Sequence, residues 1–257
     1  MSDIRVLSFN IRNSCDKGNR AWDERIINFV PLVKSIYPDL MGFQEVLHNQ
    51  YLDLTEQFPE YSSVGIGRDD GINAGERAAI FYKKSRFTLI ESGSFWLSET
   101  SDKPSFGWDA VCIRICTYVK LLDNTTKKEF FYFNTHLDHV GQTAMAEGAK
   151  LIRKNMLDKN FPAFVTGDFN VEEKSEPYNI MTEKGLSDAK YTAKSTMSYG
   201  TFNNYNPSEN MKNESPIDYL FHTDNDFDVD TYKVIVNGQE GTYTSDHYPV
   251  LVVLSQK

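Results

Sequence analysis

Short apolar segments that end on an acid, an amide or a histidine constrain this chain more than any other feature of its sequence. In FPAFVTGDFN, residues 161–170, an apolar run leads directly into Asp168 and Asn170. A short apolar run bounded by turn residues is typical of a buried strand. Polar side chains at the end of such a strand are costly to bury alone, so they are expected to have partners or a ligand.

The same ending recurs in other strand-like segments. The polar residues delivered in this way are Asn10, Gln44, Glu45, Asn134, His136, Asp138, Asp168, Asn170, Asp218, Asp246 and His247. Each one alone has an ordinary explanation, because Asx residues form turns, acids favour helix starts and histidines are often buried. Their repetition across separate segments instead indicates one shared site.

The kinds of side chain in this set indicate the chemistry of that site. Carboxylates and amides without paired cysteines favour Mg²⁺ or Mn²⁺ over structural zinc. Mg²⁺ keeps several waters in its shell and often adds substrate phosphate. A histidine paired with an acid can transfer protons. Together these groups predict metal-assisted hydrolysis of a phosphate ester.

Charge and composition narrow the class of partner. The formal net charge is −9, and basic residues cluster only in pairs, as in YKKSRF and TKKEF. Because duplex nucleic acid is bound through a basic surface, a duplex substrate is disfavoured. The three cysteines are too scattered for a disulfide framework. With no long apolar run and no recognisable signal segment, we expect a cytoplasmic protein without membrane insertion, unless a signal segment was removed.

Hydrophobic periodicity predicts many strands and a few helices. Strands are expected at 4–9, 39–46, 61–66, 78–83, 86–97, 111–121, 129–136, 163–168, 217–222, 229–236 and 247–254. Helices are expected at 47–57, 141–158, 175–183 and 22–37, the last with a kink or break at Pro31. This mixture favours α/β or α+β layers in a single domain, residues 1–257, and we expect a monomer. The polar loops 64–77 and 199–216 are long enough to be functional.

Several of these motifs stand in the order found in the endonuclease/exonuclease/phosphatase superfamily, which the chain resembles over residues 4–254. They are FNI with Asn10, GFQEV with Glu45, NTHLD with His136, GDFN with Asp168 and Asn170, IDYLF with Asp218 and SDHYP with Asp246 and His247. The superfamily includes deoxyribonuclease I, repair endonucleases, deadenylases, sphingomyelinases and inositol polyphosphate phosphatases. The resemblance implies a four-layer α/β sandwich, with two mixed β-sheets face to face and helices outside.

The resemblance also implies a metal site. Glu45 would be the principal ligand for Mg²⁺ or Mn²⁺, helped by Asn10 and Asp246. The chain departs from the repair endonucleases at Arg12, where those enzymes carry an acid that adds to the metal site.

A catalytic group is implied beside the metal site. Asp168 would orient or deprotonate the attacking water, while Asn170 and His136 would hold phosphoryl oxygens. His247, polarised by Asp218, would act as general acid or base.

Candidate substrate-binding residues are Arg114, Arg77 and Trp108. Arg114 could contact phosphate, although an exposed strand position would explain it equally well. Trp108 could stack on a base or sugar ring, and core packing is the alternative explanation. The loop at 64–77 adds Arg68 and Glu76 close to the expected cleft.

The leading prediction is a Mg²⁺-dependent hydrolase of phosphate esters, with a small or single-stranded anionic substrate such as a nucleotide, an RNA end, or a sugar or inositol phosphate. An endonuclease or exonuclease on DNA and a phospholipid phosphodiesterase are alternatives within this chemistry. A glycoside hydrolase could use Glu45 and Asp168 as paired carboxylates, but would leave His136, Asp218 and His247 without a role. A non-catalytic binding module is a further alternative.

Overall fold

The computed structural model describes residues 2–206, 211–212, 214–237 and 242–257, so part of the predicted polar loop 199–216 lies outside the described residues. One sheet contains β1 (Ile4–Asn10), β2 (Leu40–Val46), β3 (Tyr61–Val64), β4 (Arg77–Lys83), β10 (Ser195–Met197), β12 (Phe227–Val234) and β13 (Val250–Gln256). The other sheet contains β5 (Phe87–Trp96), β6 (Ile115–Asp123), β7 (Glu129–His136), β8 (Ala163–Asp168), β9 (Leu186–Asp188) and β11 (Asp218–Thr223).

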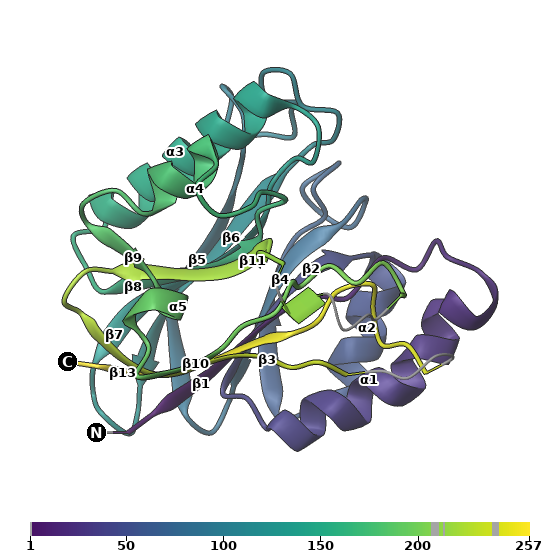
Figure 1. The fold of residues 1–257 in the computed structure, drawn as a ribbon, viewed down its shortest axis with the longest axis horizontal. Coiled ribbons are helices and arrows are strands. Elements are labelled where there is room, and N and C mark those ends of the chain that lie inside the picture. The colour runs from purple at the N-terminus through teal and green to yellow at the C-terminus, as the bar shows by residue number, and fades with distance from the viewer. Residues whose placement is uncertain (1, 207–210, 213, 238–241) are drawn as a thin grey trace.

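The two sheets pack face to face, and helices cover their outer faces (Figure 1). The strand orders are β10-β12-β13-β1-β2-β4-β3 and β5-β6-β7-β8-β11-β9. The helices α1 (Trp22–Ile36) and α2 (His48–Gln57) cover the first sheet, while α3 (Gln142–Asp158) and α4 (Glu176–Met181) cover the second. The short helices are η1 (Gly18–Arg20) and α5 (Ala189–Thr192). The predicted four-layer sandwich with two mixed sheets is confirmed.

The observed elements differ from the expected ones where local sequence carries little information. The short elements β9, α5 and β10 were not expected, because a segment of three or four residues is too short to display a period. The helix α1 continues through Pro31 instead of ending there. Pro31 has no N–H to donate to the carbonyl of Ile27, four residues earlier. Both residues lie on the exposed face of the helix, where water can hydrate that carbonyl.

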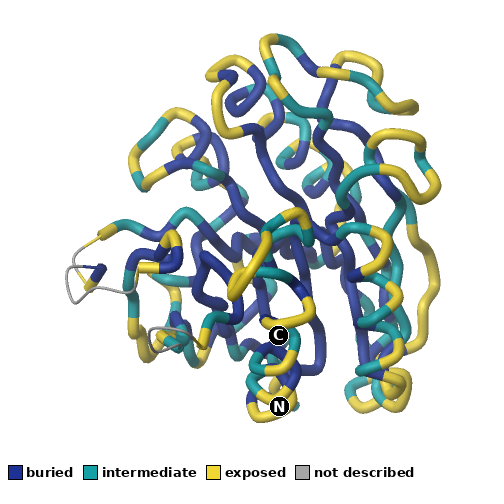
Figure 2. Tube along the Cα trace, turned by 90° about the vertical axis from the view of Figure 1, so that its right-hand side faces the viewer, coloured by how far each residue is buried: buried dark blue, intermediate teal, exposed yellow. Residues whose placement is uncertain are grey.

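Alternation along the strands divides the interior into layers. In β7, Phe130 and Tyr132 belong to the core cluster between the sheets, whereas Phe131 and Phe133 belong to the cluster under α3 and α4. A third cluster joins α1 to the outer face of the first sheet. Figure 2 shows the result, with buried strands at the centre and exposed residues along the outer helices and loops.

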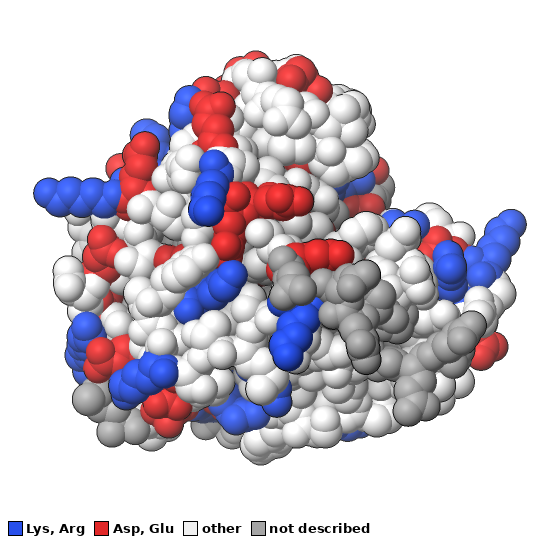
Figure 3. Space-filling model, viewed as in Figure 1, with Lys and Arg blue, Asp and Glu red and all other residues white. Residues whose placement is uncertain are grey.

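The surface carries both signs of charge. Lys and Arg are interspersed with Asp and Glu on the face shown in Figure 3, in agreement with the acidic overall composition. Among the described residues, no helix is long and apolar enough to cross a membrane.

A fully buried amide joins the two sheets. Asn134 Oδ1 accepts hydrogen bonds from Gln44 Nε2 at 2.7 Å and Thr166 Oγ1 at 3.0 Å. Its Nδ2 donates to the carbonyls of Phe43 at 2.9 Å and Ala79 at 3.0 Å. The amide thus uses both donor hydrogens and two acceptor positions, which satisfies its hydrogen-bonding capacity. Asn134 was expected among the site residues, but its contacts give it a structural role.

Gly42 allows the sheets to approach at this point. A Cβ atom on Gly42 would lie 2.3 Å from the Tyr132 hydroxyl and 2.4 Å from Thr166 Oγ1. Because alternate residues of a strand share a face, His136 and Asp168 follow Asn134 and Thr166 in the same inward rows. The buried network therefore lies directly beneath the ends of β7 and β8.

We predict that Asn134→Ala lowers the free energy of unfolding by about 3 kcal/mol, because it removes the amide donor to two buried carbonyls, takes one of its partners from the Gln44 amide and opens a cavity. Urea denaturation followed by circular dichroism measures this change. The matched control is Asn124→Ala, which removes an amide bonded to Thr88 at the surface and should cost less than about 1 kcal/mol. Equal losses for the two variants would contradict a special role for Asn134.

Candidate active site

The strand ends bring the predicted site residues to one end of the sandwich. Asn10 ends β1 and Glu45 lies near the end of β2, in the first sheet. His136 and Asp168 end the parallel strands β7 and β8 and are aligned with each other, while Asp218 begins β11 opposite Asp168. The chain termini lie near the opposite end of the same strands (Figure 1). The site therefore spans both sheets.

Left-handed backbone conformations redirect side chains at these strand ends. Glu45 has a φ of 62°, and the pairing of β2 with β4 shifts register between Phe43 and Val46. Regular alternation would place Glu45 on the side of Phe43, toward the helices, but the irregularity directs it to the cleft. Arg12 and Asn170 also have positive φ, at 55° and 52°. Such conformations cost roughly 1 kcal/mol or more each and commonly occur at functional sites.

Asn10 links carboxylates from the two sheets. Its Nδ2 donates to Glu45 Oε1 at 3.1 Å and to Asp168 Oδ2 at 2.8 Å, while its Oδ1 accepts from the backbone N–H of Arg12 at 3.0 Å. Asn10 therefore presents its nitrogen, and not its oxygen, to the carboxylates. In this geometry it positions the predicted metal ligand Glu45.

Glu45 is held in its ionised form. Burial alone would raise its pKa, but hydrogen bonds from Asn13 and Asn10 outweigh burial and lower the pKa. Asn13 donates to Glu45 Oε2 from its backbone N at 3.0 Å and from Nδ2 at 2.9 Å. Asn13 was not predicted as a site residue, and its place three residues after Asn10 is the only sequence hint.

The environment of Glu45 and Asp246 fits a divalent cation. A cation already lies nearby, because the Arg12 guanidinium is 3.9 Å from Glu45 and 3.8 Å from Asp246. Arg12 is itself bonded to Asp16 at 3.0 Å, so its guanidinium contacts three carboxylates. Hard oxygen donors in an acidic, largely buried setting suit Mg²⁺ or Mn²⁺.

The predicted acid–histidine pair is formed. His247 Nδ1 lies 2.9 Å from Asp218 Oδ2, and its Nε2 lies 3.6 Å from Asp168 Oδ2. Burial lowers the pKa of His247, but the carboxylates of Asp218 and Asp168 outweigh burial and raise it to about 10. Burial, reinforced by Asp218, raises the pKa of Asp168 above its usual range. His247 and Asp168 therefore place an imidazolium beside a carboxylate that binds protons unusually well.

The predicted phosphoryl-binding pair is engaged internally. Asn170 Nδ2 donates to His136 Nε2 at 3.0 Å and to the Leu137 carbonyl at 3.1 Å. The His136 ring is neutral, because burial first and the nearby Arg114 and Arg68 next lower its pKa well below 6.5. The other ring nitrogen, Nδ1, lies 4.0 Å from Glu76.

A cleft of about 430 Å³ connects these groups. Of the three predicted substrate-binding residues, only Arg114 lines it. Arg77 does not line the cleft; its Nη2 atom lies 3.0 Å from His48 Nδ1 and 2.8 Å from Asn73 Oδ1. Trp108 lies outside the lining residues, and its backbone N–H bonds Glu99 at 3.1 Å.

Two unpredicted aromatic residues line the cleft. Phe202 packs against the His247 ring with a centroid distance of 5.1 Å and is 45% exposed. Tyr205 donates to Asp16 at 3.0 Å. Both belong to the polar loop that length alone marked as functional, although the sequence did not indicate which of its residues face the site.

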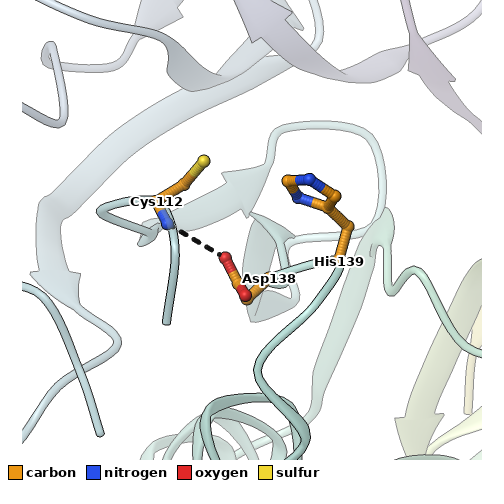
Figure 4. A group of neighbouring side chains, drawn as sticks. All are labelled: Cys112, Asp138 and His139. Atoms are coloured by element: carbon orange, nitrogen blue, oxygen red, sulfur yellow. Dashed lines mark hydrogen bonds between the residues drawn. The ribbon is translucent and has the colours of Figure 1, made fainter. Parts of the chain in front are cut away.

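A second cluster of potential metal ligands lies near the cleft at Cys112, Asp138 and His139 (Figure 4). The Asp138 carboxylate accepts backbone N–H bonds from Cys112 at 3.2 Å and Gly141 at 2.8 Å, and also from Val111 and Val140. These bonds occupy its oxygens and tie the loop before β6 to the start of α3. The possible ligand atoms of the three residues lie within 4.8 Å of one another, and Figure 4 shows the hydrogen bond from the Cys112 backbone N to Asp138. The backbone hydrogen bonds of the Asp138 carboxylate give this cluster a structural role.

We predict that Asp218→Asn moves the His247 pKa toward 6.5 by at least about one pH unit, because it removes the principal charge that raises it. Imidazole ¹H–¹⁵N NMR of the metal-free protein measures this change. The His247 imidazolium stabilises the folded state below pH 6.5, and this stabilisation is lost as the pH rises toward 10. Asp218→Asn should therefore make the free energy of unfolding less dependent on pH in this range.

The His222 ring, which bonds Thr192 at 2.9 Å, is an internal control in the same spectra and should titrate alike in both proteins. A wild-type His247 that titrates near 6.5 would contradict the prediction.

Comparisons with known proteins agree with this geometry. The sequence profile of the Endonuclease/Exonuclease/phosphatase family matches residues 7–247. An endonuclease/exonuclease/phosphatase from Bacteroides vulgatus is 37% identical, with a TM-score of 0.93 and 100% of both chains covered. The mannosyl-6-phosphatase of Bacteroides thetaiotaomicron is 37% identical, with a TM-score of 0.89 and 98% of this chain and 99% of that chain covered.

One curated relative is an uncharacterized protein of Acanthamoeba polyphaga mimivirus, 26% identical over 164 residues. That match spans 60% of this chain and 60% of the relative. The profile match covers nearly the whole chain, and the structural matches share its two-sheet fold. The chain therefore belongs to the endonuclease/exonuclease/phosphatase family, whose members hydrolyse phosphate esters.

Proposed function

We propose that the protein is a Mg²⁺-dependent phosphatase that removes phosphate from small substrates, with sugar phosphates the first candidates. The observation that carries this proposal is the continuous arrangement from Glu45 through Asn10 to Asp168 and on to His247. This arrangement supports the proposal, because a carboxylate suited to a cation, a carboxylate suited to accept a proton and an imidazolium lie in sequence along it. Phosphoryl transfer to water uses these three kinds of group.

Glu45 and Asp246 would hold the cation. A bound Mg²⁺ would supply a positive charge that stabilises negative charge developing on the phosphoryl oxygens. Asn10 and Asn13 keep the Glu45 carboxylate ionised and fixed in orientation. A site that is already ordered has little reorganisation to undergo when charge develops.

Asp168 and His247 divide the proton handling. Asp168 is buried with a raised pKa, which makes it a better proton acceptor for an attacking water near neutral pH than an ordinary carboxylate. His247 is protonated and oriented by Asp218, so its Nε2 can donate to a phosphoryl or leaving-group oxygen. For Asn170 to bind a phosphoryl oxygen through its amide, it must exchange its bond to His136 or Leu137 for the substrate.

The cleft and the surface favour a small substrate. A volume of about 430 Å³ accommodates a phosphorylated metabolite. The net charge of −9, together with the interspersed Lys, Arg, Asp and Glu on the face shown in Figure 3, disfavours a long nucleic acid as the substrate. The similarity to a mannosyl-6-phosphatase, at 37% identity over nearly the whole chain, supports sugar phosphates in particular.

We predict that the protein with Mg²⁺ hydrolyses 4-nitrophenyl phosphate faster than bis(4-nitrophenyl) phosphate, and that excess EDTA abolishes both reactions. Glu45→Gln and His247→Ala should each lower kcat/KM by about a hundredfold or more, because they remove cation binding and proton donation. Release of 4-nitrophenol measures each rate.

The matched control is His48→Ala, since His48 is an exposed histidine at the start of α2, outside the cleft. It should retain wild-type activity. Hydrolysis that persists in excess EDTA, or that is undiminished in His247→Ala, would rule out the proposed mechanism. A preference for the diester would rule out a phosphatase while leaving metal-dependent ester hydrolysis in place.

A further inference from the structure

We propose that Arg68, Glu76 and Arg114 form a hydroxyl-binding subsite that recognises the polyhydroxylated leaving group of the substrate. This inference rests on the proposed function and assigns substrate recognition to residues outside the metal and proton-transfer groups. Arg68 and Glu76 come from the loop between β3 and β4, and Arg114 immediately precedes β6. All three line the same cleft as His247.

The first observation is a set of buried donors without hydrogen bonds. Arg114 is only 5% exposed, yet its Nε and Nη1 atoms have no hydrogen-bond acceptor among the described residues. The Nε atom of Arg68 is in the same situation. Buried donors without acceptors are uncommon in native structures, and a ligand that supplies acceptors would explain them.

The second observation is the balance of charge around these donors. Glu76 pairs closely with Arg68 and lies 3.7 Å from Arg114, and Asp138 lies 3.8 Å from Arg114. Two guanidinium groups thus face two carboxylates, so the subsite has no excess positive charge for a second phosphate. Hydroxyl groups fit better, because each can accept from a guanidinium and donate to a carboxylate.

The third observation is that the loop carrying Arg68 and Glu76 is ordered by its own bonds. The Arg68 backbone N–H donates to the Glu76 carbonyl at 3.1 Å, and the Arg68 carbonyl accepts from Trp96 Nε1 at 2.7 Å. At Gly67 a Cβ atom would lie 2.3 Å from the Ala74 carbonyl oxygen. The subsite is therefore preformed, which lowers the entropic cost of binding.

The subsite lies beside the reacting groups. Glu76 Oε2 is 4.0 Å from His136 Nδ1, and His136 Nε2 is 3.4 Å from Asp168. A phosphate held near Asp168 and His247 would therefore place an attached sugar ring against Arg68, Glu76 and Arg114. Selectivity follows because a leaving group without hydroxyls supplies no acceptors to the Arg68 Nε donor and the Arg114 Nε and Nη1 donors.

The test begins with the wild-type protein and a set of substrates. We measure kcat/KM for glucose 6-phosphate, mannose 6-phosphate, and the 2-, 3- and 4-deoxy analogues of the better one, each relative to 4-nitrophenyl phosphate. At least one deoxy analogue should lose about tenfold or more, as expected for a hydrogen bond to a charged group. This comparison requires no variant.

The second arm repeats the series with Glu76→Gln and, separately, with Arg68→Lys. In at least one variant, kcat/KM for the deoxy analogue should be less than about threefold below kcat/KM for the parent sugar phosphate. The difference from the wild type should arise mainly in KM. Because every rate is taken relative to 4-nitrophenyl phosphate, a uniform loss of active protein does not alter the result. The control is Asp123→Asn, which removes a buried carboxylate paired with Arg86 at 2.9 Å outside the cleft. It should keep the wild-type ratios.

The outcomes separate the subsite from the proposed function. If the wild type hydrolyses neither aryl nor hexose phosphates, the proposed function is wrong and the subsite falls with it. If it hydrolyses them with no loss for any deoxy analogue, the phosphatase assignment stands and the subsite is overturned. If both variants keep the wild-type deoxy loss, recognition resides elsewhere and the subsite is likewise overturned.

Discussion

The buried amide of Asn134 sets the relation between the two sheets, and the site depends on that relation. Its four hydrogen bonds join β7 to β2, β4 and β8, at a point where Gly42 permits close approach. Directly above it, Asn10 from one sheet bonds Asp168 from the other at 2.8 Å. A contact of that length between sheets requires a fixed spacing, because a displacement of one ångström would break it.

Two carboxylates at the site, Glu45 and Asp168, have pKa values shifted in opposite directions. Glu45 and Asp168 are both buried carboxylates that accept from Asn10, yet the pKa of Glu45 is lowered and that of Asp168 is raised. Two additional N–H bonds from Asn13 account for much of the difference at Glu45, while Asp218 opposes ionisation of Asp168. A carboxylate that stays ionised suits a cation, and one that readily takes a proton suits an attacking water.

Most of the fold could be predicted from the sequence, because long strands and helices display their periods. The motif residues could be placed at strand ends for the same reason, and the structure brings them together. Whether an inward-facing side chain reaches the cleft is harder to predict. Asn134 and His136 look equivalent in FFYFNTHLD, but one lies between the sheets and the other in the cleft. Their depth along the strand decides this, and sequence spacing does not reveal it.

Other residues that the sequence did not place correctly have equally specific structural causes. Arg68 and Arg77 both fall in the predicted loop 64–77, yet Arg68 lines the cleft, whereas Arg77 begins β4 and contacts Asn73 and His48. The left-handed turn at Glu45 depends on a register shift against β4, which involves residues far along the chain. Such features arise from tertiary pairing, so local propensity cannot predict them.

The most direct test of the account is to locate the cation itself. Crystals of the protein soaked in MnCl₂ give an anomalous difference map in which bound Mn²⁺ appears as a peak. The account predicts a peak within about 2.5 Å of a Glu45 carboxylate oxygen and on the side of Asp246. A map with no peak at Glu45, or with its strongest peak between Cys112 and His139, would contradict it.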